Sequence, residues 1–334
     1  MERNLLVDRL KGYACFLVLF GHVIMGVRVA GIQTPAFLWG LERFIWSFHV
    51  ALFLFLSGVV YRLTGEWRGK QTKLKFLGYK LYSLGVPYVA FSAVYILINS
   101  FADQVNTQSS PGDILLIWKE PVAQYWFLYA LFFLFCLWTI CSGLLENWHI
   151  TLGAVLIGYL APVLGVPLGC LEVVFYSALA FGAGTVLDFA SLTKPVTCVK
   201  WLVVLLHVAA GSLFVRTGLL ESAFIKEFML LFGICASISL ISVLQNCTPV
   251  ARFLDFMNRY SFQTYLLHTI FTAGIRIILL RLGVGQWWIH VLLGTAFGIT
   301  CSVLAAKIAK KATVLNWFFF PTKLHKQGKV SAML

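Results

Sequence analysis

The sequence predicts an all-α integral membrane protein with about ten transmembrane helices. Sixty per cent of the 334 residues are apolar and only 12% are charged, whereas a soluble globular domain has roughly 25% charged residues. Such a chain lacks the polar surface needed to coat a soluble particle. The apolar residues also fall into runs of about 20, the length of helix that crosses a bilayer. These observations favour one membrane domain over residues 1–334, without an appended soluble catalytic domain.

The expected spans follow the apolar runs along the chain. The fifth is short, and the break from Pro162 to Pro167 is brief, so the fifth and sixth form a candidate re-entrant pair. The first run is longer than the apolar core of a signal peptide and no cleavage site stands out, so we expect a retained helix. The spans are expected at 10–30, 41–61, 80–101, 122–142, 150–165, 168–188, 199–217, 222–245, 260–281 and 287–310.

The placement of Lys and Arg predicts that both termini are cytoplasmic. With ten spans and an inner N-terminus, most of the 26 Lys and Arg residues lie on the cytoplasmic side, as the positive-inside rule requires. Two inner segments are notably basic: a cytoplasmic loop at 62–80 and a cytoplasmic tail at 311–334. The net charge of +13 therefore reflects topology and attraction to anionic lipid. It requires no nucleic acid partner.

Titratable groups inside the first two spans are the first candidates for function. Lys11 and His22 are eleven residues apart, which puts them on one face of a helix, roughly 16 Å apart along its axis. His49 is expected at a depth similar to that of His22, so the two imidazoles can face each other across the first helical hairpin. Ionisable groups in a bilayer are costly and usually mark function. The layout suits transfer of a group from a cytoplasmic donor to an outer acceptor.

Structural roles stay open for the same residues. A carbonyl of a neighbouring helix can satisfy His22, and Lys11 can snorkel to the headgroups as an anchor. The 62–80 loop holds six cations and one Glu, so it suits either a coenzyme A nucleotide or an anionic lipid surface. Trp126 fits an interfacial belt. The eight cysteines are scattered and indicate neither a disulfide framework nor a metal site.

Six short motifs follow one another along the chain: Asp8-x-x-Lys11-Gly12 with His22, Phe48-His49 to Ser57-Gly58, Lys80 to Pro87, Tyr125-Trp126-Phe127-Leu128, Phe175-Tyr176 to Gly182-x-Gly184, and Tyr260-Ser261 to His268. In this order they resemble the membrane acyltransferase-3 family, in particular its fucose 4-O-acetylase-like and surface-polysaccharide O-acetyltransferase members. The first motif resembles the family's Arg-x10-His signature, with Lys11 in place of arginine. This change removes the planar fork that binds oxygen pairs. The resemblance covers nearly the whole chain.

The resemblance implies transfer of an acyl group, usually acetyl, from cytoplasmic acyl-CoA to a sugar hydroxyl of a surface polysaccharide or lipid-linked glycan. The enzyme would lie in the cytoplasmic (inner) membrane, use acetyl-CoA as co-substrate and need no metal. His22 would be the catalytic base, either directly or through an acyl-imidazole. Acyl-CoA would be held by Lys11, Asp8, Arg62, Arg68, Lys73, Lys75 and Lys80, and the acceptor side would be lined by His49, Glu42, Arg43, Trp126 and His268.

Two other functions are compatible with the sequence. A secondary transporter or flippase for a polar or lipid-linked sugar also places His and Lys in the membrane, although no paired inverted repeats are visible. A non-catalytic scaffold for a polysaccharide polymerase is the third. The sequence leaves open the acceptor sugar, the acyl group and whether the chain forms a homo-oligomer.

Overall fold

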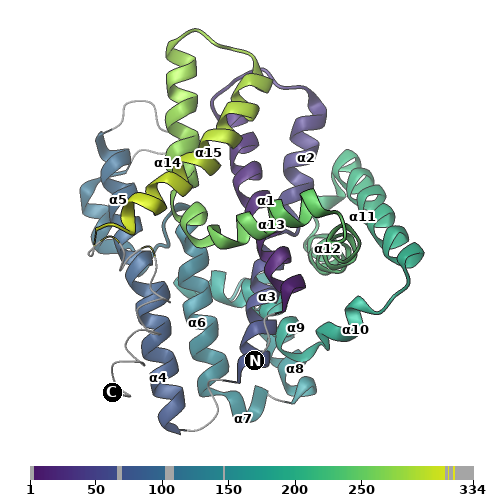
Figure 1. The fold of residues 1–334 in the computed structure, drawn as a ribbon. Coiled ribbons are helices and arrows are strands. Elements are labelled where there is room, and N and C mark those ends of the chain that lie inside the picture. The colour runs from purple at the N-terminus through teal and green to yellow at the C-terminus, as the bar shows by residue number, and fades with distance from the viewer. Residues whose placement is uncertain are drawn as a thin grey trace. The chain divides into compact units, whose positions relative to one another are not determined.

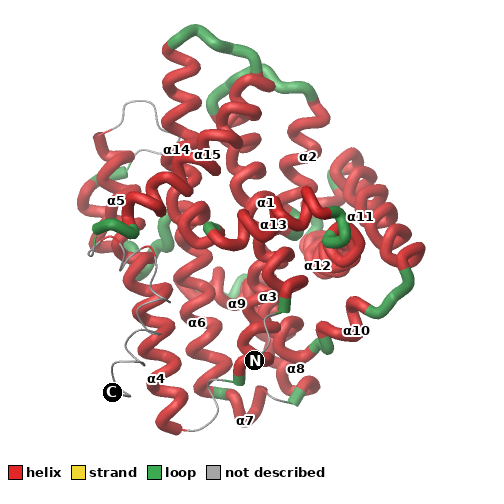
Figure 2. Tube along the Cα trace, in the orientation of Figure 1, coloured by secondary structure: helices red, strands yellow, loops and turns green. Residues whose placement is uncertain are grey.

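The computed structural model is built from helices (Figures 1 and 2), which confirms the all-α membrane fold. It describes residues 4–65, 70–101, 109–145 and 147–312, together with residues 315 and 319. Within these residues there is no strand, and nine helical segments are long and apolar enough to cross a membrane. They are Leu5–Val29, Ala36–Thr64, Thr72–Phe101, Ala123–Ile140, Gly169–Val186, Thr197–Thr217, Ala223–Leu244, Ser261–Arg281 and Trp287–Ala309.

These nine segments correspond to nine of the ten predicted spans. The predicted fifth span is occupied by α8 (Trp148–Val163), an apolar helix of 16 residues. A helix of that length rises about 24 Å, less than the roughly 30 Å of a hydrocarbon core. It packs on α9 (Glu172–Val186), where Phe175 lies directly against Gly158. The short fifth helix is therefore paired closely with the sixth.

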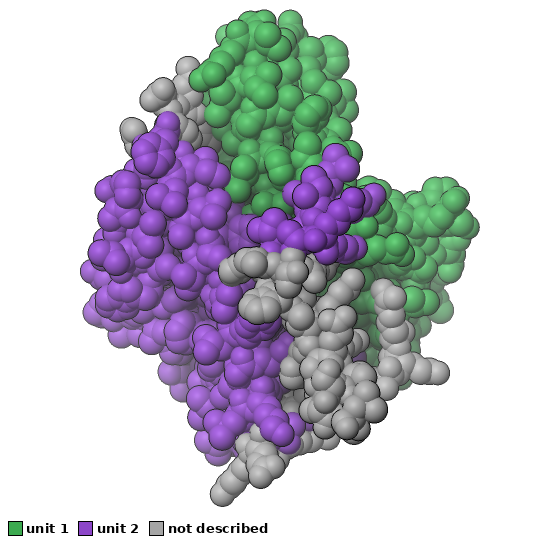
Figure 3. All heavy atoms as spheres, turned by 60° about the vertical axis from the view of Figure 1, so that its left-hand side comes forward, with its two compact units in different colours: residues 1–60, 187–303 green, residues 61–186, 304–334 purple. Residues whose placement is uncertain are grey.

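The chain divides into two compact units, residues 1–60 with 187–303 and residues 61–186 with 304–334 (Figure 3). The first unit contains α1 (Leu5–Val29), α2 (Ala36–Trp46), the start of α3 (His49–Thr64), α10 (Phe189–Thr193), α11 (Thr197–Thr217), α12 (Ala223–Leu244), α13 (Thr248–Arg259), α14 (Ser261–Arg281) and most of α15 (Trp287–Ala309). The second contains the end of α3, α4 (Lys70–Lys80), α5 (Val86–Phe101), α6 (Trp126–Ile140), α7 (Ser142–Leu145), α8 and α9. Short turns of 3-10 helix lie at Pro111–Leu116, Ala123–Tyr125, Gly169–Leu171 and Leu219–Glu221, and a π-helical turn at Leu81–Gly85.

Helix α1 is the central helix of the first unit and packs against α2, α12, α13 and α14. A Cβ atom at Gly12 would collide with the carbonyl oxygen of Leu254, so only glycine lets α1 and α13 approach this closely. Gly294 and Gly298 of α15 face the C-terminal half of α1. This small-xxx-small spacing is typical of closely packed membrane helices.

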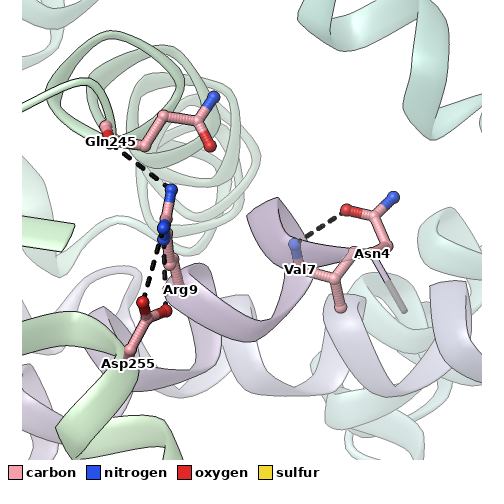
Figure 4. A network of polar contacts seen from close by, with 5 residues as sticks. All are labelled: Asn4, Val7, Arg9, Gln245 and Asp255. Carbon is pink, nitrogen blue, oxygen red and sulfur yellow. Dashed lines mark hydrogen bonds and ion pairs between the residues drawn. The ribbon is translucent and has the colours of Figure 1, made fainter. Parts of the chain in front are cut away.

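An ion pair ties α1 to α13, which lies across it (Figure 1). Nε of Arg9 lies 3.1 Å from Oδ1 of Asp255, and Nη2 lies 3.3 Å from Oδ2 (Figure 4). Nη1 of Arg9 also donates to the carbonyl oxygen of Gln245, at 3.4 Å. Asn4 caps α1 by accepting from the amide of Val7, at 3.2 Å. The N-terminal half of α1 is thus fixed by both packing and charge.

The second unit has an aromatic core. Tyr61 packs against Phe135, with ring centroids 5.9 Å apart, and its hydroxyl lies 3.3 Å from that of Thr139. Phe76 of α4 packs on the same Phe135 ring, at 5.8 Å. This contact explains a departure from expectation, since much of the predicted 62–80 loop is helical. Helix α3 continues to Thr64, and α4 occupies Lys70–Lys80. The predicted tail at 311–334 lies almost entirely outside the described residues.

Candidate active site

Three histidines from three helices meet in the first unit. His22 of α1 lies edge-to-face with His268 of α14, with ring centroids 4.9 Å apart. The indole of Trp46, the last residue of α2, lies 5.3 Å from the His22 ring and 5.4 Å from that of His49, the first residue of α3. His49 and His268 are buried, and His22 is partly buried. We call these four residues the histidine cluster.

The three imidazoles are held in the same way. The Nδ1 atom of each ring lies 2.8 or 2.9 Å from the backbone oxygen four residues earlier, which for His22 is that of Val18. Because a carbonyl oxygen only accepts, each Nδ1 must carry a proton, and in the neutral ring Nε2 keeps its lone pair. The buried Nε2 atoms of His49 and His268 have no hydrogen-bond partner within the described residues.

This tautomer decides what the cluster can do chemically. Each ring turns Nδ1 back to its own backbone, so Nε2 faces away from the helix that carries it. An imidazole with a free Nε2 lone pair can accept a proton from a hydroxyl or attack a carbonyl carbon. The described residues contain no group of three or more His, Cys, Asp or Glu side chains arranged to hold a metal ion. Among the residues that the structure describes, His22 is bonded to its own helix and not to a neighbouring one.

The second predicted span is interrupted beside the cluster. It begins at Ala36, five residues before the predicted start at 41, and breaks between Trp46 and His49. The carbonyl oxygen of Ile45 accepts from the amide of Phe48, at 3.3 Å, and from Nδ1 of His49, at 2.8 Å. The ring thus occupies the acceptor that its own backbone amide would use in a continuous helix.

An ion pair between the exposed Arg28 and the buried Glu42 lies close to the cluster. The Glu42 carboxylate receives hydrogen bonds from Nε and Nη2 of Arg28, at 2.7 and 2.8 Å. It interacts electrostatically with His22. Arg43, the next residue, forms an ion pair with Glu221 and so ties α2 to the turn before α12. Sequence reasoning missed Arg28, although a buried carboxylate requires a cationic or hydrogen-bonding partner.

The residues predicted to bind acyl-CoA are distributed over both units. Asp8 and Lys11 lie on α1, the helix that carries the predicted base, and both are partly buried. Lys73 and Lys75 lie on α4. Arg68 lies outside the described residues.

Two more residues predicted to bind acyl-CoA, and one predicted on the acceptor side, belong to the second unit. Nη1 of Arg62 donates to the carbonyl oxygen of Val186, at 2.7 Å. Nζ of Lys80 lies 3.8 Å from the centre of the Phe135 ring, within the range of a cation–π interaction. Trp126 is the first residue of α6 and is partly buried.

Trp46 is the member of the cluster that sequence reasoning missed. It precedes His49 by three positions, a spacing that places two side chains on one helix face, and this was the available signal. His207, for which no partner was predicted, is buried outside the cluster. Its ring lies 4.8 Å from that of Phe44 and 5.0 Å from that of Phe48.

Comparison with known proteins adds one finding. The family model described as an acyltransferase domain matches residues 4–307, a range that contains the whole histidine cluster. No curated protein and no solved structure matches the chain.

Proposed function

Because the chain belongs to this acyltransferase family, we propose that it transfers an acyl group from cytoplasmic acyl-CoA to a sugar hydroxyl. Acetyl is the proposed acyl group, and a surface polysaccharide or lipid-linked glycan is the proposed acceptor. The fucose 4-O-acetylase-like subtype is the form that the motif resemblance favours. The bias of Lys and Arg supports an orientation with both termini cytoplasmic, in the inner cell membrane.

The observation that carries this proposal is the set of bare Nε2 atoms in the histidine cluster. A buried acceptor without a donor is costly, and hydroxyl groups are the donors that sugars supply. His22 is the member that is partly accessible, whereas His49 and His268 are buried. An acceptor hydroxyl that donates to Nε2 of His22 is therefore placed to lose its proton as it reacts.

In the direct mechanism, the hydroxyl oxygen attacks the thioester carbonyl carbon while Nε2 of His22 takes its proton. Collapse of the tetrahedral intermediate breaks the carbon–sulfur bond, and His22 returns the proton to the departing coenzyme A sulfur. In the alternative, Nε2 attacks the thioester carbonyl carbon, the carbon–sulfur bond breaks and coenzyme A leaves as a thiolate. The hydroxyl oxygen then attacks the acyl-imidazole, the carbon–nitrogen bond breaks, and the hydroxyl proton passes to the departing Nε2. Both routes use the same tautomer. His49, Glu42, Arg43, Trp126 and His268 are the proposed acceptor-side residues.

The proposed donor site rests on charge and position. Lys11 supplies a cation on the helix that carries His22, and Asp8 lies one turn before it. Arg62, Arg68, Lys73, Lys75 and Lys80 would bind the phosphates of coenzyme A. Lysine in place of arginine at position 11 gives a point charge and no bidentate contact.

The test is to measure acyl transfer by the purified full chain in lipid. Wild type should release free thiol from acetyl-CoA and move labelled acetyl to extracted membrane glycolipid only when both substrates are present. His22→Ala should abolish both signals, whereas His149→Ala, a change at an exposed residue of α8, should leave them intact. A folded His22→Ala variant with full transfer would contradict the role of His22.

The interruption between α2 and α3 also suits a transporter, because broken membrane helices are common in transporter binding sites. The same assay separates the two functions. Movement of a lipid-linked sugar across vesicles without acyl-CoA, and with no label transferred, would favour transport. Label on the glycolipid would favour the acyltransferase.

A further inference from the structure

The break between α2 and α3 exposes the amino end of a helix near the middle of a 29-residue span. The first hydrogen bond within α3 is from the amide of Leu52 to the carbonyl oxygen of Phe48, at 3.0 Å. The amides of His49, Val50 and Ala51 therefore come before the first amide that bonds in the helical pattern. They mark the positive end of a 16-residue helix.

Within the described part of the chain these three amides have no backbone acceptor, which is unusual inside a membrane-spanning segment. In a bilayer core each unsatisfied backbone group costs several kcal/mol, so irregular backbone occurs only where protein or a wet cavity surrounds it. Ala51 and His49 are buried inside the first unit. Val50 between them is partly exposed. The end of α3 is therefore mostly enclosed by protein, and a ligand bound there can accept from these amides.

A second, independent observation points to the same place. His49 is 1% exposed and His268 is 0% exposed. The buried Nε2 atoms of both lack a partner within the described residues. Trp46, which ends α2 at the break, contacts both His49 and His22. His268 turns Nδ1 to its own backbone, so its Nε2 faces away from α14, where its ring meets His22.

The unbonded amides and His49, whose Nε2 atom has no partner within the described residues, thus belong to the same end of α3. A simple anion would use only the donors, and a hydroxyl that donates to an imidazole leaves most of the amide donors unused. A thioester carbonyl oxygen next to an attacking hydroxyl uses both. The chemistry of acyl transfer fits this arrangement, because its carbonyl oxygen gains negative charge as the tetrahedral intermediate forms.

We propose that the amides of Val50 and Ala51, at the amino end of α3, form the oxyanion site of this enzyme. This inference rests on the proposed function. As the hydroxyl oxygen bonds to the carbonyl carbon, the carbonyl π electrons move to oxygen, and the two amides donate hydrogen bonds to that oxyanion. When the carbon–sulfur bond breaks, the carbonyl re-forms and the hydrogen bonds weaken.

The test is to replace one amide by an ester without changing a side chain. Incorporation of the α-hydroxy analogue of valine at position 50 removes the N–H group and keeps the isopropyl group. The matched control is the same analogue at Val199, which also lies in the first turn of a membrane helix of the first unit, α11. Each ester also makes the carbonyl oxygen of the preceding residue a weaker hydrogen-bond acceptor. The two variants therefore differ only in where the N–H group is lost, which is at the break for position 50 and away from it for position 199.

We expect the ester at position 50 to lower kcat about 100-fold, the effect of removing one oxyanion donor, with KM for acyl-CoA nearly unchanged. The ester at position 199 should match wild type. Equal rates in both esters and wild type would overturn the oxyanion assignment, and so would equal losses in both esters. Wild type without any transfer would instead overturn the proposed function, and the oxyanion site with it.

Discussion

The two halves of α1 differ in how their polar and small residues are used. In the N-terminal half, Gly12 admits the backbone of α13 and Arg9 is paired with Asp255. In the C-terminal half, His22 joins a cluster whose buried Nε2 atoms lack partners within the described residues. We call the N-terminal half, which is held by packing and an ion pair, the fixed half. We call the C-terminal half, which carries His22, the cluster half. The difference teaches that, on one continuous helix, burial alone does not distinguish structure from function.

The largest expected effect is on the fixed half. Gly12→Ala places a methyl group against the Leu254 carbonyl oxygen, which is backbone and cannot rotate away. We expect a loss of about 3 kcal/mol of stability, at the upper end for overpacking, seen as a lower thermal midpoint in detergent. Gly78→Ala on α4 is the control, since a Cβ there meets open space. An unchanged midpoint in Gly12→Ala would remove the distinction between the halves.

The next effect is on the cluster half. His268→Asn should lower kcat about 10- to 100-fold because it removes the Nε2 acceptor, a loss of roughly 1–3 kcal/mol, with little change in thermal midpoint. His290→Asn is a matched control, since His290 is a buried histidine of the same unit whose Nε2 already bonds to the Val284 oxygen, at 2.8 Å. The comparison would fail if the two variants lost activity equally.

Lys11 tests whether the N-terminal half of α1 is only structural, because it is a residue of that half that we predict to contact acyl-CoA. Lys11→Ala should raise KM for acyl-CoA about tenfold through loss of one charge-assisted contact, whereas Lys11→Arg should restore binding. Titration of acyl-CoA in the transfer assay measures both. Lys194→Ala, at an exposed cation of the first unit, should have no effect. A normal KM in Lys11→Ala would return Lys11 to the role of a membrane anchor.

The smallest effect is expected from the ion pair that ties α1 to α13. A double-mutant cycle with Arg9→Gln and Asp255→Asn should give a coupling of about 0.5–1 kcal/mol, because the pair is only partly exposed. The control cycle on Lys226 and Glu221, whose side chains are both more than half exposed, should give about zero. Equal couplings would mean that packing at Gly12, and not charge, fixes this half.

The sequence was sufficient to predict the spans but not the interruption in the second one. Apolar runs of bilayer length are a strong signal, and nine of them correspond to observed helices. Nothing in Trp46-Ser47-Phe48 marks a break, since neither Gly nor Pro is present. At the break the ring of His49 takes the Ile45 carbonyl oxygen, but the same bond at His22 and His268 leaves their helices continuous, so it gives no local signal for a break. Helix α4 was missed because its lysines were attributed to a loop.

The candidate site was also predicted only in part. Equal depth in a hairpin placed His22 near His49, and both contact Trp46 in the structure. His268 came from motif resemblance and lies in contact with His22. The partner of Glu42 could not be predicted, because the rotation of α2 about its axis decides which cation it faces.

The hydrogen bonds at Nδ1 also determine whether the three imidazoles can conduct protons across the membrane. A row of imidazoles conducts protons when each ring gains a proton on one nitrogen and releases it from the other. Here Nδ1 of His22, His49 and His268 is held by the backbone, so a proton that arrives at Nε2 must leave from Nε2. The cluster can hold a proton for one reaction cycle without passing it onward. The three histidines of the cluster, two buried and one partly buried, therefore do not form a proton-conducting row.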